Sequence, residues 1–219
     1  PDIRGHGASG KHGDIAYLGQ LEDDMADLLA LVKARHPGLP VELLGFSSGG
    51  GFALRIACGP VGDGFAGFVL VSPYLAYDSP TVRAGSGGWA RANVPRIIGL
   101  TILHRLGMRS LEGLPIVHFA VAAEAGDQVT AWYSYRLQAN FEPHRDYAAD
   151  LRRAIGGGRP MAVLVGAQDD IMYADQFAPL LAKLAPTATV DVLPGINHTG
   201  MTLQPAASDA IAARLRSMP

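Results

Sequence analysis

Cysteine is nearly absent from this sequence. Cys58 is the only cysteine among 219 residues, so no disulfide forms within the chain. A chain without disulfides fits a reducing compartment, and we therefore predict a cytoplasmic protein. Cys58 follows an apolar stretch, where it is expected to be a small core residue of a helix.

An excess of charge of either sign is also lacking. The chain has 18 lysines and arginines against 20 acidic residues, a net charge of −2, and its basic residues are scattered. This balance gives no reason to expect nucleic acid or an anionic membrane as a partner. No apolar run approaches the roughly 18 residues of a membrane span, so no integral membrane segment is expected.

Sequence patterns typical of metal sites are missing too. The chain has no H-E-x-x-H motif and no closely spaced set of cysteines and histidines. Such motifs place metal ligands on one helix or in one loop, where they meet without help from distant parts of the chain. We therefore expect no metal site and no cofactor.

Short apolar runs alternate with helical spacing over much of the chain. Residues 41–46 and 66–72 are β-rich runs with a helix between them, so parallel strands buried on both faces are expected. A hydrophobic content of 48% over 219 residues suffices for one sizeable α/β core. The same patterns predict helices at 15–36, 173–185 and 204–217 and strands at 161–166 and 188–193.

Residues 74–158 break this alternation. They are mixed and aromatic, with proline and glycine interruptions, and we interpret them as a mostly helical insertion or cap. The alternation resumes afterwards, so the predicted organisation is a core in two parts, 1–73 and 159–219, around the cap at 74–158.

The segment Gly45-Phe46-Ser47-Ser48-Gly49 reads G-x-S-x-G and follows an apolar run. This pattern is typical of a strand, a sharp turn and a helix with a serine at the apex, where the hydroxyl is open to a base. The sequence therefore predicts Ser47 as a nucleophile.

A serine hydroxyl needs a base to take its proton, and the base needs a partner to fix its tautomer. Among seven histidines, only His198 lies just past a predicted terminal strand. Ligand crevices of open parallel sheets lie beyond the carboxyl ends of the strands, so a loop there brings His198 to Ser47. Asp169 or Asp170, just after the strand at 161–166, is expected to orient the histidine.

Four segments together resemble the α/β-hydrolase-fold serine hydrolases, in the branch of lysophospholipase-like, monoacylglycerol-lipase-like and serine-aminopeptidase-like proteins. They are PDIRGHGASG at 1–10, GFSSGG at 45–50, VGAQDD at 165–170 and LPGINHTGM at 193–201. The order Ser, Asp, His along the chain is that of this fold. The resemblance implies Asp169 as the acid, the amide of Ser48 as an oxyanion donor, and a cap at 74–158.

The resemblance also implies strands upstream of Pro1, which this chain lacks. The strand that carries Ser47 is therefore expected at an edge of the sheet. The loop that would supply the other oxyanion amide is expected upstream of Pro1 as well, and loss of one such donor costs about 10²–10³ in turnover.

These observations predict a serine hydrolase that cleaves an acyl ester through Ser47, His198 and Asp169 and an acyl-enzyme intermediate. A small-molecule acyl ester is the expected substrate, lipase- or lysophospholipase-like by resemblance, with Tyr74 and Met201 as candidate pocket residues. Two alternatives remain open. One is amide, peptide or perhydrolase chemistry on the same triad, and the other is an inactive fragment or non-catalytic ligand-binding homologue.

Overall fold

Two compact units make up the chain, which a computed structural model describes over residues 1–85, 88–121 and 129–218. The first unit combines Pro1–Met25 with Gly88–Phe141, and the second combines Ala26–Gly87 with Glu142–Pro219. The predicted cap boundaries at residues 74 and 158 stay predictions.

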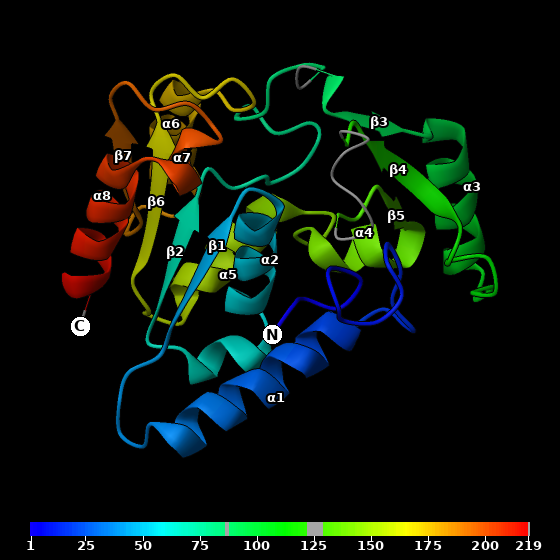
Figure 1. The fold of residues 1–219 in the computed structure, drawn as a ribbon, viewed down its shortest axis with the longest axis horizontal. Helices are drawn as coiled ribbons and strands as arrows, with labels where there is room; N and C mark the ends of the chain where they lie inside the picture. Colours follow the sequence, from blue (N-terminus) through cyan, green and yellow to red (C-terminus); the bar gives the residue numbers. More distant parts are fainter. Residues whose placement is uncertain (86–87, 122–128, 219) are drawn as a thin grey trace. The chain divides into compact units, whose positions relative to one another are not determined.

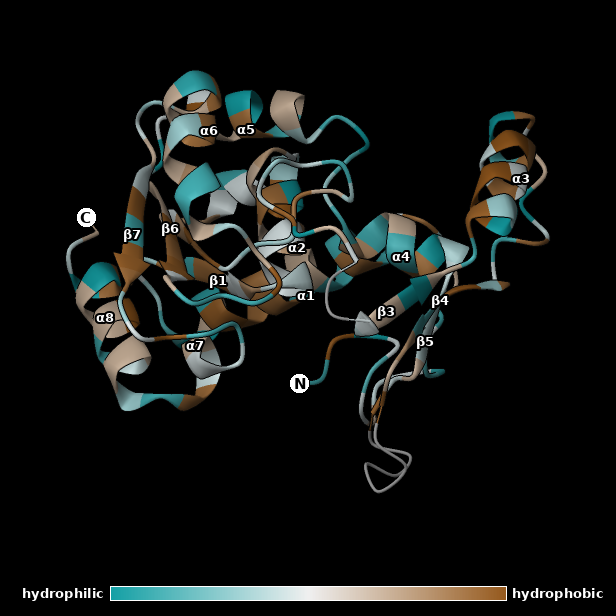
Figure 2. Cartoon of the chain, turned by 90° about the horizontal axis from the view of Figure 1, so that it is seen from above, coloured by the Kyte–Doolittle hydropathy of each residue, from teal (hydrophilic) through white to brown (hydrophobic). Residues whose placement is uncertain are grey.

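The second unit contains a parallel sheet of four strands. They are β1 (Glu42–Phe46), β2 (Gly67–Val71), β6 (Met161–Gly166) and β7 (Thr189–Leu193), in the order β1-β2-β6-β7 (Figure 1). All residues of β2 and β6 are buried, and β6 is brown in the hydropathy view of Figure 2. Continuous apolar runs are expected of strands covered on both faces. The structure confirms the four strands predicted from the sequence.

Helices cover both faces of this sheet. They are α2 (Ser48–Ala57), α5 (Tyr147–Gly156), α6 (Phe177–Leu184), α7 (Gly200–Leu203) and α8 (Pro205–Arg216). Helix α2 packs against β1 and β2. A separate core cluster joins β2 and β6 to α7 and α8; it consists of Val69, Val71, Ala162, Leu164, Ile196, Met201 and Ala207. Burial of such side chains contributes about 25 cal/mol per Å² of apolar area.

The strand order places distant segments of chain together. Strands β2 and β6 are neighbours in the sheet, although residues 72–160 separate them in the sequence. Because all four strands are parallel, their carboxyl ends lie at one edge of the sheet. The loops after β1, β6 and β7 therefore meet there, as ligand-binding loops of such sheets do.

The first unit contains an antiparallel sheet of β3 (Ala90–Ala92), β4 (Pro115–Phe119) and β5 (Trp132–Ser134), with β4 in the middle. Helix α3 (Val94–Arg105) packs against β4, and α4 (Tyr135–Phe141) follows β5 directly. The inserted segment thus mixes strand with helix, where its sequence predicted mostly helices. Two of its three strands have only three residues, too few to display an alternating pattern.

The long helix α1 (Gln20–Arg35) begins in the first unit and ends in the second. Its sequence pattern predicts a start near residue 15, whereas the structure begins the helix at Gln20. Helix ends follow capping contacts more than apolar spacing, and the Gln20 side chain accepts a hydrogen bond from the Ala16 amide at 2.6 Å. In the described part of the chain, no helix is long and apolar enough to span a membrane.

Gly45 lies before the turn into α2, where the backbone of Gly49 comes too close to leave room for a side chain. A Cβ added there would overlap the carbonyl oxygen of Gly49, whereas a Cβ added at Gly49 meets no atom within 4 Å. We expect Gly45→Ala to lower the free energy of unfolding by about 1–3 kcal/mol. Gly49→Ala is the matched control and should leave it unchanged or raise it by up to about 1 kcal/mol. Urea unfolding of the two variants measures the difference, and equal stabilities would contradict this account of the turn.

Candidate active site

Ser47 lies at a sharp turn between β1 and α2. Its backbone has φ 53° and ψ −118°, and a positive φ is uncommon outside glycine and often marks a functional position. The turn is fixed by hydrogen bonds: the Ser47 amide donates to Val71 O, and the Ser47 carbonyl accepts from the Gly50 and Tyr74 amides, all at 2.9 Å. The surrounding sheet and helix therefore hold the residue in this strained form.

His198 follows β7 and reaches Ser47 from the neighbouring loop. Its Nε2 atom lies 3.0 Å from Ser47 Oγ, within the range for a hydrogen bond. The residue is 5% exposed, and its ring packs on Phe46 with the ring centroids 4.8 Å apart. Phe46 is thus a positioning contact for the histidine that the sequence analysis did not identify; it is the variable residue before the serine in G-x-S-x-G.

Asp169 binds the other side of the imidazole. Its Oδ2 lies 2.8 Å from His198 Nδ1, and its Oδ1 accepts hydrogen bonds from the amides of Ile171 at 2.9 Å and Met172 at 2.7 Å. Asp170 instead accepts the backbone amide of His198, at 3.2 Å. Of the two acids left open by the residue pattern, Asp169 is the one whose carboxylate contacts the histidine ring.

Burial and hydrogen bonding oppose each other at Asp169. Burial raises the pKa of this carboxyl, but the hydrogen bond and charge of His198 and the amides of Met172 and Ile171 lower the pKa more, so the net shift is downward. The carboxylate therefore stays ionised at neutral pH. An ionised acceptor at Nδ1 keeps the proton on that nitrogen and leaves Nε2 with its lone pair facing Ser47.

This shift predicts how stability depends on pH. The pKa of Asp169 is lower in the folded chain than the ordinary 3.8, so its contribution is present above that value and is lost as pH falls through the folded pKa. We expect the free energy of unfolding of the wild type to fall more steeply below about pH 4 than that of Asp169→Asn. Urea unfolding across a pH series measures both slopes, and parallel curves would argue against the assigned shift.

Residues 81–83 make hydrogen bonds that hold the Asp169 loop in place. The Arg83 side chain donates from Nε to the carbonyls of Asp169 and Met172, both at 3.1 Å, and its guanidinium stacks 4.3 Å from the Tyr173 ring centroid. The Tyr173 amide donates to Thr81 O at 2.7 Å. The sequence analysis missed these residues because nothing in the local pattern around Arg83 points to a loop so distant along the chain.

The remaining predicted site residues lie in different settings. Ser48 opens α2, where the first amides of a helix have no partner within the helix and attract negative charge. Tyr74 is half-buried, and its amide binds Ser47 O. Met201 is 1% exposed and packs in the core cluster beneath the His198 loop, so the structure gives its side chain a packing role. Substrate contact by Tyr74 and Met201 stays a prediction.

Comparisons with known proteins bear on this geometry. Residues 1–202 match the family described as serine aminopeptidase, S33. A comparison with curated protein sequences gave no match.

Solved structures of lipases and esterases resemble the chain in fold. A monoglyceride lipase from Saccharomyces cerevisiae is 19% identical with a TM-score of 0.63, over 99% of this chain and 75% of the lipase. A monoacylglycerol lipase from Paleococcus ferrophilus is 20% identical with a TM-score of 0.63, over 99% of this chain and 80% of the other. A thermostable carboxyl esterase from Bacillus coagulans is 17% identical with a TM-score of 0.68, over 99% and 79%. At these identities the likeness establishes the α/β-hydrolase fold, as predicted.

Proposed function

The chain belongs to the serine aminopeptidase family of α/β hydrolases, and on that premise we propose that it is a serine hydrolase acting on carboxylic esters. The contact that carries the proposal is the 3.0 Å approach of His198 Nε2 to Ser47 Oγ. Asp169 at 2.8 Å from Nδ1 completes the series of nucleophile, base and orienting acid.

In the proposed reaction, Ser47 Oγ attacks the ester carbonyl carbon while its proton passes to His198 Nε2. The Ser48 amide, at the start of α2, donates to the oxyanion of the tetrahedral intermediate. His198 then gives the proton to the departing alcohol, which leaves an acyl group on Ser47. Water attacks this acyl-enzyme with His198 again as base and releases the acid. Asp169 stays ionised throughout and stabilises the imidazolium.

Labelling with a fluorophosphonate tests the nucleophile directly. The probe reacts with activated serines, so we expect one adduct per chain, located on Ser47 by peptide mass spectrometry. Ser47→Ala should remove the adduct. Ser48→Ala is a matched control because it keeps the backbone amide and should still label. A folded wild-type chain that does not label would contradict the proposal and favour a non-catalytic binding protein.

The leaving group is tested separately. The names of the neighbouring structures favour esters, including monoacylglycerols, whereas the family description favours amide or peptide bonds. We expect kcat/KM for p-nitrophenyl esters and a monoacylglycerol to exceed that for aminoacyl p-nitroanilides. Preference for the anilides would replace the ester proposal with a peptidase while leaving the triad in place.

A further inference from the structure

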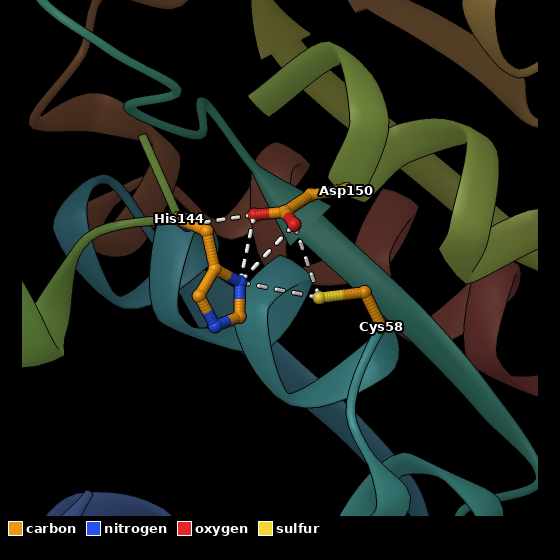
Figure 3. A group of neighbouring side chains, drawn as sticks. All are labelled: Cys58, His144 and Asp150. Carbon is orange, nitrogen blue, oxygen red and sulfur yellow. Dashed lines mark hydrogen bonds and ion pairs between the residues drawn. The ribbon is translucent and has the colours of Figure 1, made fainter. Parts of the chain in front are cut away.

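A second cluster of reactive side chains lies in the same unit, outside the proposed triad. Figure 3 shows Cys58, His144 and Asp150 directed toward one another. Cys58 Sγ is 3.6 Å from His144 Nδ1 and 3.4 Å from Asp150 Oδ1, and Nδ1 is 3.1 Å from the same Oδ1. We propose that these three residues form a binding site for a divalent zinc-like cation, with the fourth position taken by water.

The distances match those that a tetrahedral ion imposes. Zinc binds sulfur at about 2.3 Å and nitrogen or oxygen at about 2.0–2.2 Å, which puts sulfur about 3.5 Å from each light ligand and the two light ligands about 3.4 Å apart. The three separations in the structure lie within about 0.3 Å of those values. The set of sulfur, imidazole nitrogen and carboxylate oxygen is also one that zinc accepts.

The surroundings suit an ion that enters from solvent. The side chain of His144 is 46% exposed, whereas that of Asp150 is 2% exposed, so one side of the cluster is open for entry and for a water ligand. The Asp150 Oδ2 atom accepts the His144 backbone amide at 2.6 Å. This second bond orients the carboxylate and leaves Oδ1 for the ion, as outer partners of metal ligands do.

Charge and protons balance in the binding step. The Cys58 thiol releases its proton to solvent as the sulfur–metal bond forms, and His144 binds through the Nδ1 lone pair with its proton on Nε2. One thiolate and one carboxylate then neutralise the two positive charges of the ion. The sequence analysis expected no metal site because Cys58 lies 86 residues from His144 and 92 from Asp150.

The location indicates a structural role. Cys58 caps the carboxyl end of α2, whose amino end follows Ser47, and Asp150 lies in the first turn of α5, which packs on α2. A bound ion would link these helices at the end of α2 remote from the nucleophile. The inference is independent of the proposed hydrolase activity.

Cobalt titration tests the site because the chain has one cysteine. The reduced, chelator-treated protein is titrated with Co²⁺ while the thiolate-to-cobalt charge-transfer band and the visible bands of tetrahedral cobalt are recorded. We expect both to saturate at one equivalent and to disappear on addition of Zn²⁺. Any charge-transfer band must arise from Cys58, so the wild-type titration tests the thiolate ligand and the stoichiometry even where a variant fails to fold.

Variants then identify the other ligands. Cys58→Ser should abolish the charge-transfer band, and His144→Ala and Asp150→Asn should each weaken Co²⁺ binding at least about tenfold, since even outer-shell losses cost that much. His118→Ala, which replaces an exposed histidine of β4, is the matched control and should bind as the wild type does. Circular dichroism verifies that each variant is folded.

Thermal unfolding gives an independent readout. Zn²⁺ at about a hundredfold excess over its dissociation constant should raise the Tm of the wild type by about 5–10 °C and leave that of Cys58→Ser unchanged. Absence of a charge-transfer band at one equivalent, or a band that persists undiminished in both His144→Ala and Asp150→Asn, would overturn the proposal. The cluster would then be a hydrogen-bonded set only.

Discussion

Ser47→Ala is expected to lower kcat for ester hydrolysis by about 10⁶-fold. The substitution removes only the hydroxyl group. His198 Nε2, which lies 3.0 Å from Ser47 Oγ in the wild type, then has no nucleophile to activate. The residual rate would come from binding and from the oxyanion donors alone. Initial rates with a p-nitrophenyl ester, with active sites counted by the acyl-enzyme burst of the wild type, measure the effect.

Ser48→Ala provides the comparison for that experiment. It removes a hydroxyl one residue away but keeps the amide proposed for the oxyanion, so we expect a change in kcat of less than about tenfold. Comparable losses in the two variants would mean that damage to the turn, rather than loss of the nucleophile, explains the result. Retained activity in Ser47→Ala would rule out the proposed mechanism.

Asp169→Asn is expected to reduce kcat by about 10⁴-fold, because an amide facing Nδ1 favours the wrong imidazole tautomer. The Asn side chain keeps an oxygen for the amides of Ile171 and Met172, so the loop should hold its shape. Steady-state kinetics measured beside the Tm of each variant separate this electronic effect from unfolding.

Asp170→Asn is the matched control for the acid. Its carboxylate accepts the backbone amide of His198 at 3.2 Å, whereas the hydrogen bonds of the His198 ring in the described part of the chain go to Asp169 and Ser47. The loss should stay within about tenfold, the worth of one hydrogen bond. A larger loss from Asp170→Asn than from Asp169→Asn would reassign the orienting acid.

The sheet was predictable from the sequence because its two central strands, β2 and β6, are buried on both faces. The sequences of β2 and β6 are continuous runs of apolar residues. Such runs, with amphipathic helices between them in the sequence, indicate buried parallel strands. The antiparallel sheet of the first unit was not predictable. Its strands β3 and β5 have three residues each, and long-range pairing with β4 decides their conformation.

The candidate site, too, has one part that could be predicted from the sequence and one part that could not. Ser47 lies in a local motif whose geometry follows from adjacent glycines, and Asp169 and His198 each follow a recognisable strand, so all three were found from the sequence. Their catalytic roles stay predictions. The brace from Arg83 and the cluster around Cys58 rest on contacts between segments more than 80 residues apart. The periodicity and residue spacing of a single sequence cannot predict contacts between segments so far apart.

The direct pairing of β2 with β6 has a consequence for how the chain tolerates change. Residues 72–160 form a loop closed by that pairing, and the entropy of closing a flexible loop grows only with the logarithm of its length. Doubling the enclosed length would cost about 0.6 kcal/mol. Insertions in exposed parts of this stretch therefore cost the sheet little free energy, provided that the contacts of Tyr74 with Ser47, of Arg83 with the Asp169 loop and of α5 with α2 are kept.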